Sequence, residues 1–360
     1  MRDAARGFEI AGRVIGPGHP PYIICELSAN HQGSLERAIA LMDAAAATGC
    51  DAIKIQTYTA DTLTIASERP EFKISGGLWD GRTLHDLYQE AYTPYEWHPA
   101  LFAHARRLGV PLFSTPFDET AVELLASLDA PAYKIASFEI VDLPLIARVA
   151  KQGRPMIIST GMANLGEIGE AVAAARDNGA DGVALLHCVS SYPAAMEDAN
   201  VATVPHLGEA FGCISGLSDH TPGSAAAVAS VALGGAIIEK HFTLARADGG
   251  PDSAFSLEPA EFKALVDDCR SAWKAVGAVN YDLLGSERGS IQFRRSLYAV
   301  ADIKAGELLS AANVRSIRPG HGLAPKHLSS VLGQRATRDI GRGEPLEWTM
   351  LTSPNAKDPR

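Results

Sequence analysis

Two lysines occupy otherwise apolar segments of the sequence, Lys54 in AIKIQ and Lys134 in AYKIA. An unpaired ammonium is costly to bury there, so each lysine needs a carboxylate, solvent or an anionic ligand. Hydroxyl side chains end or follow comparable segments, at Thr115, Ser137, Ser159 and Ser218. Ammonium and hydroxyl groups that converge on one point suit a phosphate. A Schiff-base lysine is an alternative, but it does not explain the hydroxyl groups.

Two histidines and one glutamate stand at the ends of further apolar segments. His220 and His241 follow two of them, and Glu26 closes the first. Neutral imidazoles on neighbouring strands could bind one divalent cation, with water and a carboxylate completing the shell. We interpret His187 as structural because it lies inside an apolar run. Glu26 could be a general acid or base, or it could anchor a loop.

The apolar segments themselves predict eight strands. They are Tyr22–Leu27, Ala52–Gln56, Pro111–Thr115, Ala132–Ala136, Met156–Ser159, Val183–Cys188, Ile214–Ser218 and Ile237–His241. Continuous apolar runs are typical of parallel strands covered on both faces. Eight strand–helix units in about 255 residues fit a (β/α)₈ TIM barrel, whose active site forms at the C-terminal strand ends. An open doubly wound sheet is less favoured because no G-x-G-x-x-G follows the first strand.

Amphipathic or alanine-rich stretches between the strands predict helices, including Ser34–Thr48, Pro94–Leu108, Glu119–Leu128, Leu165–Asn178 and Glu261–Val276. The connection between the second and third strands is much longer than the others. Residues 58–93 therefore predict a loop over the barrel mouth. Such insertions are often functional covers, although a plain surface loop is the alternative.

Composition limits the classes of partner and the compartment. The 360 residues include 32 basic and 42 acidic side chains, a net charge of −10, which argues against a nucleic-acid binder. The longest apolar run, Ala225–Ile238, is shorter than the roughly 20 residues that span a membrane. The five cysteines show no C-x-x-C spacing. A reducing cytoplasm is therefore the expected location.

The sequence changes character after Val276. A polar stretch, GSERGS, leads to short β-type runs separated by Gly and Pro turns. We predict a barrel domain over residues 1–280 with a short N-terminal extension, a linker over 281–294 and a small turn-rich domain over 295–360. A domain of that size can fold but is marginal alone.

Many of these segments resemble the sialic acid synthase family. They include CELSANH (25–31), KIQT (54–57), FSTPF (113–117), YKIAS (133–137), ISTGM (158–162), GLSDH (216–220), EKH (239–241) and GPD (250–252). The segment from Arg295, with IRPG at 317–320, is similar to that family's C-terminal antifreeze-like (SAF) domain. The resemblance runs in order along nearly the whole chain. It implies a TIM barrel followed by an antifreeze-like domain.

Within that family, ELSANH, LWDGRTLHDLYQEAYTP and GPDSAFSLEP most resemble the members that make pseudaminic acid. The resemblance implies condensation of phosphoenolpyruvate with 2,4-diacetamido-2,4,6-trideoxy-L-altrose and water, giving pseudaminate and phosphate. Glycosylation of flagellin or surface polysaccharide would use the product. A synthase of N-acetylneuraminate or legionaminate, a Schiff-base aldolase, and a sugar-binding or scaffold protein are the alternatives.

The resemblance also implies residue roles. His220 and His241 would bind Mn²⁺, with Mg²⁺ or Co²⁺ as alternatives, and Glu26 would be the acid or base. Phosphoenolpyruvate would be held by Lys54, Thr115, Lys134, Ser137, Ser159, Ser190 and Ser218. The sugar or the water shell of the metal would face Gln56, Glu139, Tyr192 and Asp252. Arg318 would reach the barrel mouth from a second subunit of a domain-swapped homodimer.

Overall fold

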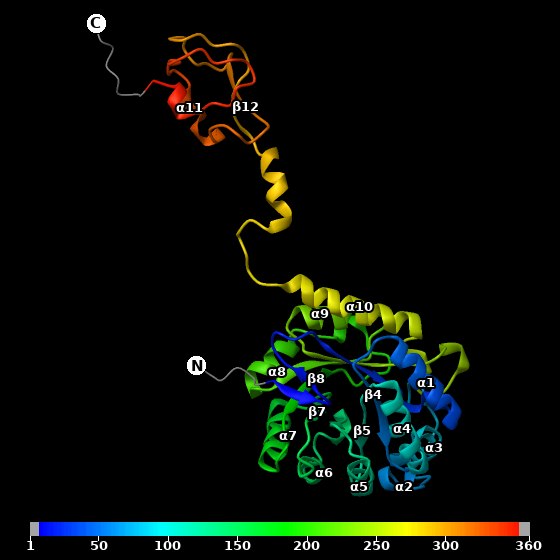
Figure 1. Ribbon diagram of the computed structural model, residues 1–360. Helices are drawn as coiled ribbons and strands as arrows, with labels where there is room; N and C mark the ends of the chain where they lie inside the picture. Colours follow the sequence, from blue (N-terminus) through cyan, green and yellow to red (C-terminus); the bar gives the residue numbers. More distant parts are fainter. Residues whose placement is uncertain (1–6, 353–360) are drawn as a thin grey trace. The chain divides into compact units, whose positions relative to one another are not determined.

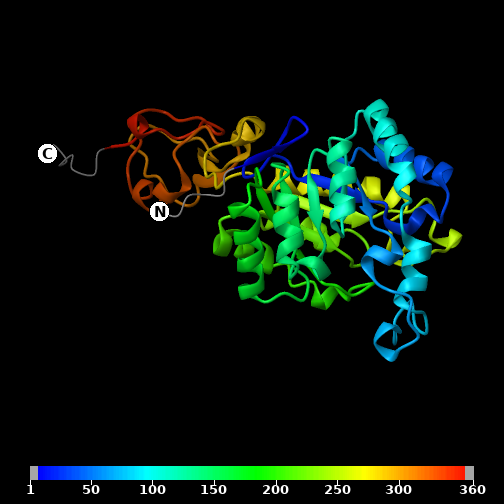
Figure 2. The same cartoon turned by 90° about the horizontal axis from the view of Figure 1, so that it is seen from below.

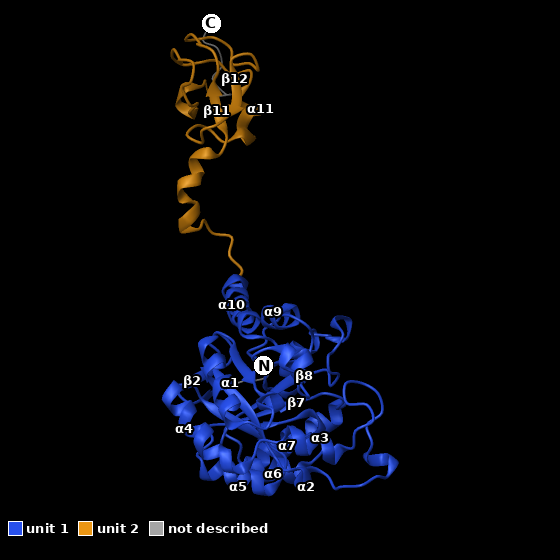
Figure 3. Ribbon diagram, turned by 90° about the vertical axis from the view of Figure 1, so that its right-hand side faces the viewer, with its two compact units in different colours: residues 1–277 blue, residues 278–360 orange. Residues whose placement is uncertain are grey.

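The structure is a computed structural model that describes residues 7–352. The chain divides into two compact units, residues 1–277 and 278–360 (Figure 3). The first six residues of the predicted barrel domain and the last eight of the predicted C-terminal domain lie outside the described part.

The first unit is a closed barrel of eight parallel strands in the order β10-β3-β4-β5-β6-β7-β8-β9 (Figure 1). This confirms the predicted TIM barrel and rules out the open sheet. The strands are β3 (Tyr22–Glu26), β4 (Ala52–Thr57), β5 (Leu112–Pro116), β6 (Tyr133–Ile135), β7 (Met156–Ser159), β8 (Val183–Cys188), β9 (Ile214–Asp219) and β10 (Ile237–His241). Each coincides with a predicted strand to within two residues at either end.

Helices surround the strands as the sequence predicts. They are α1 (Leu35–Ala47), α4 (His98–Leu108), α5 (Glu119–Ser127), α6 (Leu143–Ala150), α7 (Leu165–Asp177), α8 (Thr203–Phe211), α9 (Ala225–Ala232) and α10 (Pro259–Val276). Local caps set several starts. Ser34 accepts a hydrogen bond from the Arg37 amide, and Asp118 accepts from two amides of α5, which satisfies donors that a helix start leaves free.

Strand alternation separates two faces of the barrel wall, because successive side chains point to opposite sides. Outward-facing residues such as Ile23, Ile53 and Ile158 pack against the helices in the main apolar core. The inward-facing residues near the strand starts are also apolar, for example Ile24 and Ile157. Two residues further along each of these two strands, the inward positions are Glu26 and Ser159. The lumen therefore changes from apolar to polar towards the C-terminal strand ends.

A short hairpin precedes the barrel. Its strands β1 (Phe8–Ile10) and β2 (Arg13–Ile15) pair antiparallel, and Phe8, Ile10 and Ile15 join the apolar cluster of the inward-facing strand residues. Phe8 packs so closely on Gly182 that a Cβ there would lie 2.7 Å from it. The hairpin therefore closes the N-terminal end of the barrel. From the sequence, only a short N-terminal extension is predicted here.

The insertion between β4 and β5 is partly helical. It contains α2 (Ala60–Leu63) and α3 (Leu84–Ala91), and in Figure 2 its light-blue part projects from the body of the barrel. The indole N–H of Trp79 donates to the Pro251 carbonyl oxygen, 3.0 Å away. This bond ties the insertion to the loop after β10.

The second unit has its own small core. A 3-10 helix (Gly285–Phe293) comes first, followed by β11 (Ser296–Ala299), β12 (Val314–Ile317) and α11 (Leu328–Val331). Leu297, Val314 and Leu346 are among its buried residues. No helix within residues 7–352 is long and apolar enough to cross a membrane.

Candidate active site

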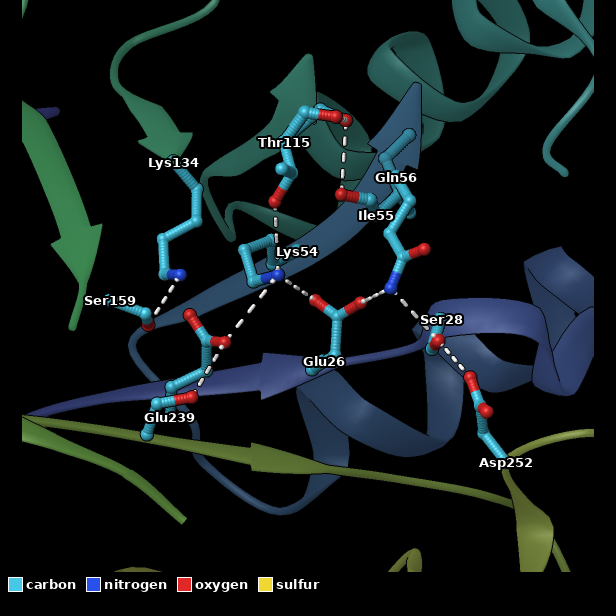
Figure 4. A network of polar contacts seen from close by, with 12 residues as sticks. Glu26, Ser28, Lys54, Ile55, Gln56, Thr115, Lys134, Ser159, Glu239 and Asp252 are labelled. Atoms are coloured by element: carbon cyan, nitrogen blue, oxygen red, sulfur yellow. Dashed lines mark hydrogen bonds and ion pairs between the residues drawn. The ribbon is translucent and has the colours of Figure 1, made fainter. Parts of the chain in front are cut away.

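A buried charge network occupies the polar end of the barrel (Figure 4). The Lys54 ammonium lies between two carboxylates, 2.5 Å from Glu26 Oε2 and 3.5 Å from Glu239 Oε1. It also donates to Thr115 Oγ1 at 3.2 Å. Burial raises the pKa of Glu26 although Lys54 opposes the shift. Glu26 can therefore hold a proton more readily than an exposed glutamate.

Lys134 is the second buried cation, but no carboxylate within the described residues lies at ion-pair distance from it. Its ammonium donates to Ser159 Oγ at 2.7 Å and to the Ile135 carbonyl oxygen at 3.0 Å, with the residue 2% exposed. Burial lowers the pKa of Lys134, a shift that Glu239 partly opposes. An anionic ligand beside Lys134 would supply the ion-pair partner that this side chain lacks among the described residues.

The remaining predicted phosphoenolpyruvate residues lie around these lysines. Ser218 Oγ donates to Glu239 Oε1 at 3.4 Å. Ser137 Oγ accepts from the Gly161 amide at 3.1 Å. A Cβ on Gly161 would lie 2.2 Å from Ser190 Oγ and 2.8 Å from Ser137 Oγ, so a glycine is required for these groups to approach each other. The hydroxyl groups thus come from several neighbouring strand ends.

The two predicted metal ligands lie on adjacent strand ends, as predicted. The His220 and His241 ring centroids are 5.4 Å apart. His220 Nδ1 lies 2.9 Å from the Val189 carbonyl oxygen, which makes Nδ1 the donor and leaves the Nε2 lone pair for a ligand. Burial lowers the pKa of His241 well below its ordinary value. His241 is therefore neutral, as a metal ligand must be.

A divalent cation fits this pair. His241 Nδ1 is buried and has no hydrogen-bond partner among the described residues, and the same is true of Glu239 Oε2. Within residues 7–352, however, no group of three or more His, Cys, Asp or Glu side chains is arranged around one point. In a site built on the two imidazoles, water or substrate would complete the shell of a bound cation.

Aromatic rings cover the histidines. The Tyr192 ring lies 4.4 Å from that of His220, and Phe255 lies 4.9 Å from His241 (centroid distances). Trp79 of the insertion contacts Tyr192 at 5.7 Å. Residues from the loops after β8 and β10 and from the insertion therefore meet over the site.

The predicted sugar-binding residues form a second polar chain. Gln56 Nε2 donates to Glu26 Oε1 at 3.1 Å and to Ser28 Oγ at 3.0 Å, and Ser28 Oγ donates to Asp252. Burial raises the pKa of Glu139 to about 7, and its Oε2 has no partner among the described residues. Arg318 differs from the rest because it belongs to the second unit, where it is exposed after β12.

A cavity of about 380 Å³ opens at this end of the barrel, with Gln56, Glu139, Tyr192, His241 and Asp252 in its lining. A larger hollow, about 820 Å³, lies beside α8 and the start of β9. None of the predicted site residues lines that hollow. The chemistry therefore belongs to the smaller cavity.

Some residues of the site have no predicted role. Glu239 pairs with Lys54 and accepts a hydrogen bond from Ser218, although the sequence predicts no role for it. Ser28 connects Gln56 to Asp252, and Phe255 covers His241. Glu239 could have been found because it occupies an inward position two residues before His241. Phe255 gave no such signal, since an aromatic residue in a loop fits many structural roles.

Comparison with known proteins identifies the family of the chain. Residues 41–281 match the NeuB family, and residues 294–352 match the SAF domain. The chain belongs to the NeuB family. This confirms the resemblance to the sialic acid synthases, and the SAF match confirms the nature of the C-terminal domain.

Relatives within the NeuB family differ in how similar they are to this chain. The chain is 46% identical to pseudaminic acid synthase from Campylobacter jejuni over 91% of its own length and 95% of that protein. It is 37% identical to N,N'-diacetyllegionaminic acid synthase of the same organism, over 89% and 97%. The crystal structure of N-acetylneuraminic acid synthetase from Leptospira borgpetersenii superposes with a TM-score of 0.72 at 30% identity, covering 82% of this chain and 98% of that one.

Proposed function

We propose that the protein is a pseudaminic acid synthase. It condenses phosphoenolpyruvate with 2,4-diacetamido-2,4,6-trideoxy-L-altrose and water to give pseudaminate and phosphate. The greater identity to the pseudaminic acid synthase than to the legionaminic acid synthase supports this substrate. The buried Lys134 ammonium, without a carboxylate at ion-pair distance in the described residues, supports an anionic co-substrate in this barrel. A non-catalytic sugar-binding or scaffold protein would not require such a buried charge.

Phosphoenolpyruvate binds between the lysines in this proposal. Lys134 with Ser159 and Lys54 with Thr115 supply charge and hydrogen bonds to its phosphate and carboxylate, and Ser137, Ser190 and Ser218 supply further hydroxyl groups. These groups are held in place by the fold before the substrate arrives. They can therefore stabilise developing charge with little reorganisation.

The carbon–carbon bond forms when the enol carbon of phosphoenolpyruvate attacks the aldehyde carbon of the open-chain sugar. Water then adds to the oxocarbenium-like carbon, and phosphate departs with cleavage of its C–O bond. Glu26, with its raised pKa, exchanges a proton with the sugar or the attacking water. Gln56 orients Glu26 by its hydrogen bond. Positioning two substrates face to face supplies much of the rate.

The imidazoles of His220 and His241 would hold a divalent cation, Mn²⁺ or alternatively Mg²⁺ or Co²⁺. Such a cation, when bound, polarises the aldehyde as a Lewis acid. Tyr192 and Phe255 pack against the two rings. Asp252 and Glu139 face the sugar from the same cavity.

We also propose a domain-swapped homodimer in which Arg318 acts at the barrel mouth of the partner subunit. Apolar side chains are exposed in the chain segment that links the two folded parts, where Val279 is 91% and Tyr281 98% exposed. Their exposure supports an additional interface.

The cytoplasm is the proposed compartment, and the five free cysteines are consistent with it. The product would serve glycosylation of flagellin or surface polysaccharide.

Phosphate release tests the proposed activity. The EDTA-treated protein receives Mn²⁺, phosphoenolpyruvate and one of three sugars: the L-altro diacetamido sugar, its D-manno counterpart or N-acetylmannosamine. Metal-dependent release with the first sugar is the expected result. Preference for another sugar would overturn the substrate, and borohydride trapping with pyruvate would instead indicate a Schiff-base aldolase.

A further inference from the structure

The candidate sugar cavity has two chemically different sides. One carries Ser28, Gln56, Glu139 and Asp252 together with His241. The other is apolar, and most of its side chains come from the insertion: Leu63, Ile74, Trp79, Leu84, Leu87, Tyr88 and Ala91. We call these seven residues the insertion wall. The lining of one cavity thus combines polar side chains of the reaction centre with an apolar surface from the insertion.

Aromatic contacts support the insertion wall from the barrel side. The Tyr58 ring, directly after β4, packs against Tyr88 of α3 at 5.9 Å and against Phe117 at 5.1 Å (centroid distances). Both contacts are edge-on, and Tyr58 is 3% exposed. The wall is therefore packed onto the barrel through these rings.

The Trp79 indole extends this support to the reaction centre. It donates to the Pro251 carbonyl and contacts the Tyr192 ring that covers His220. Pro251 immediately precedes Asp252 on the polar side. The insertion is thus anchored on both sides of the cavity.

The proposed sugar also has a polar, reactive end and an apolar end. This step depends on the proposed function. Its aldehyde, C1, must lie beside phosphoenolpyruvate and the histidines, which directs the far end of the carbon chain towards the insertion. That end is C6, a methyl group where most hexoses carry a hydroxyl. We propose that the insertion wall binds the C6 methyl group and makes the enzyme selective for 6-deoxy sugars.

The physical reason for selectivity is desolvation. A methyl group gains free energy on leaving water for an apolar surface. A C6 hydroxyl would lose its hydrogen bonds to water, and the aliphatic side chains of the wall supply no replacement. Apolar pockets discriminate against an added hydroxyl by up to about 100-fold. We therefore expect wild-type kcat/KM to favour the 6-deoxy sugar by about 10- to 100-fold.

Paired sugars and paired variants test the inference. The sugars are 2,4-diacetamido-2,4,6-trideoxy-L-altrose and its 6-hydroxy analogue, each with saturating phosphoenolpyruvate and Mn²⁺. Leu84→Asn and Leu63→Asn place an amide in the wall at half-buried positions. Leu78→Asn is the matched control, because Leu78 is in the same insertion but 48% exposed and outside the cavity lining.

The quantity that decides is the ratio of kcat/KM for the 6-deoxy sugar to that for the 6-hydroxy sugar. Each wall variant should lower this ratio by about tenfold, with the KM for phosphoenolpyruvate unchanged, and Leu78→Asn should preserve it. A purely structural defect would slow both sugars in parallel and leave the ratio intact. An unchanged ratio in both wall variants, or a wild-type ratio near one, would overturn this inference. The proposed function would still stand. Failure of the wild-type protein to use either sugar overturns the proposed function and this inference with it.

Discussion

Lys240 and Asp219 are register partners on the adjacent strands β10 and β9, and their side chains form an ion pair of 2.7 Å (Nζ to Oδ2). Both side chains are at most 1% exposed. Asp219 also accepts hydrogen bonds from the amide and hydroxyl of Thr221. Each residue immediately precedes one of the two histidines, on the opposite side of the barrel wall. The pair therefore fixes the two strand ends that carry His220 and His241.

Breaking this pair should destabilise the barrel. Lys240→Met leaves the Asp219 carboxylate buried without its cation, which typically costs about 3–5 kcal/mol. Urea unfolding measures the change in free energy. Lys263→Met is the control, because Lys263 pairs with Asp267 on the surface of α10 with both side chains more than half exposed, and that change should cost less than about 1 kcal/mol. Equal losses in the two variants would contradict the structural importance of the buried pair.

The two histidines should be separately required for metal-dependent turnover. His220→Ala or His241→Ala removes one of two imidazole ligands, so Mn²⁺ affinity measured by titration calorimetry should fall and phosphate release should be abolished. Neither change should unfold the barrel, which circular dichroism checks. His206→Ala, at an exposed position of α8, should behave as wild type. Full activity in either site variant would refute the metal assignment.

Glu26→Gln should lower kcat by at least about 100-fold, the scale of general acid–base catalysis. The amide keeps the size of the side chain but cannot exchange a proton. Lys54 retains Glu239 as a carboxylate partner, so folding should persist. Kinetics at several pH values, with Glu170→Gln on the exposed face of α7 as control, provide the measurement. A loss confined to the KM for phosphoenolpyruvate would instead assign Glu26 a binding role.

Glu139 should make stability depend on pH. Burial raises its pKa in the folded protein to about 7 from the ordinary 4.5, so the unfolded chain releases this proton first. The resulting stabilisation is present below pH 4.5 and is lost as pH rises to about 7. Relative to wild type, Glu139→Gln should gain up to about 3 kcal/mol between pH 4.5 and 8. Urea unfolding across this range tests it, and parallel curves for the two proteins would refute the raised pKa.

Arg318 should be required in trans. Arg318→Ala should lose sugar turnover while the second unit keeps its fold, because the side chain is exposed and outside the small core. Mixed dimers of Arg318→Ala and His241→Ala subunits should regain part of the activity, since one site then has both residues. Light scattering establishes the dimer. No recovery in verified mixed dimers would exclude action across subunits.

The sequence predicted the barrel well because parallel strands buried on both faces are continuous apolar runs. The glycines before several of these runs, such as Gly109 and Gly212, end helices in left-handed conformations. The hairpin at Phe8–Ile15 was missed because its strands have only three residues each, too few to establish a period of two. The hairpin is buried by strands that are distant in the sequence, and a local sequence pattern does not record such contacts.

The sequence predicted those parts of the site that follow from the barrel fold alone. Polar residues at C-terminal strand ends must meet at the barrel mouth, and this brought Lys54, Lys134 and His241 together. The outward-facing pair of Lys240 and Asp219 was not predicted, because identifying it requires the register between β9 and β10. The insertion wall was also out of reach, since residues 58–93 indicate a cover but not which side chains turn inward.

The hairpin that closes the N-terminal end of the barrel also affects the order of events in a catalytic cycle. With that end closed by Phe8, Ile10 and Ile15, the substrates share the opposite mouth. Lys134 and Ser159, each 2% exposed, lie deeper than the half-buried residues of the insertion. A bound sugar would therefore obstruct the path to the lysines. The kinetics should be sequential and ordered, with phosphoenolpyruvate adding first and the sugar second.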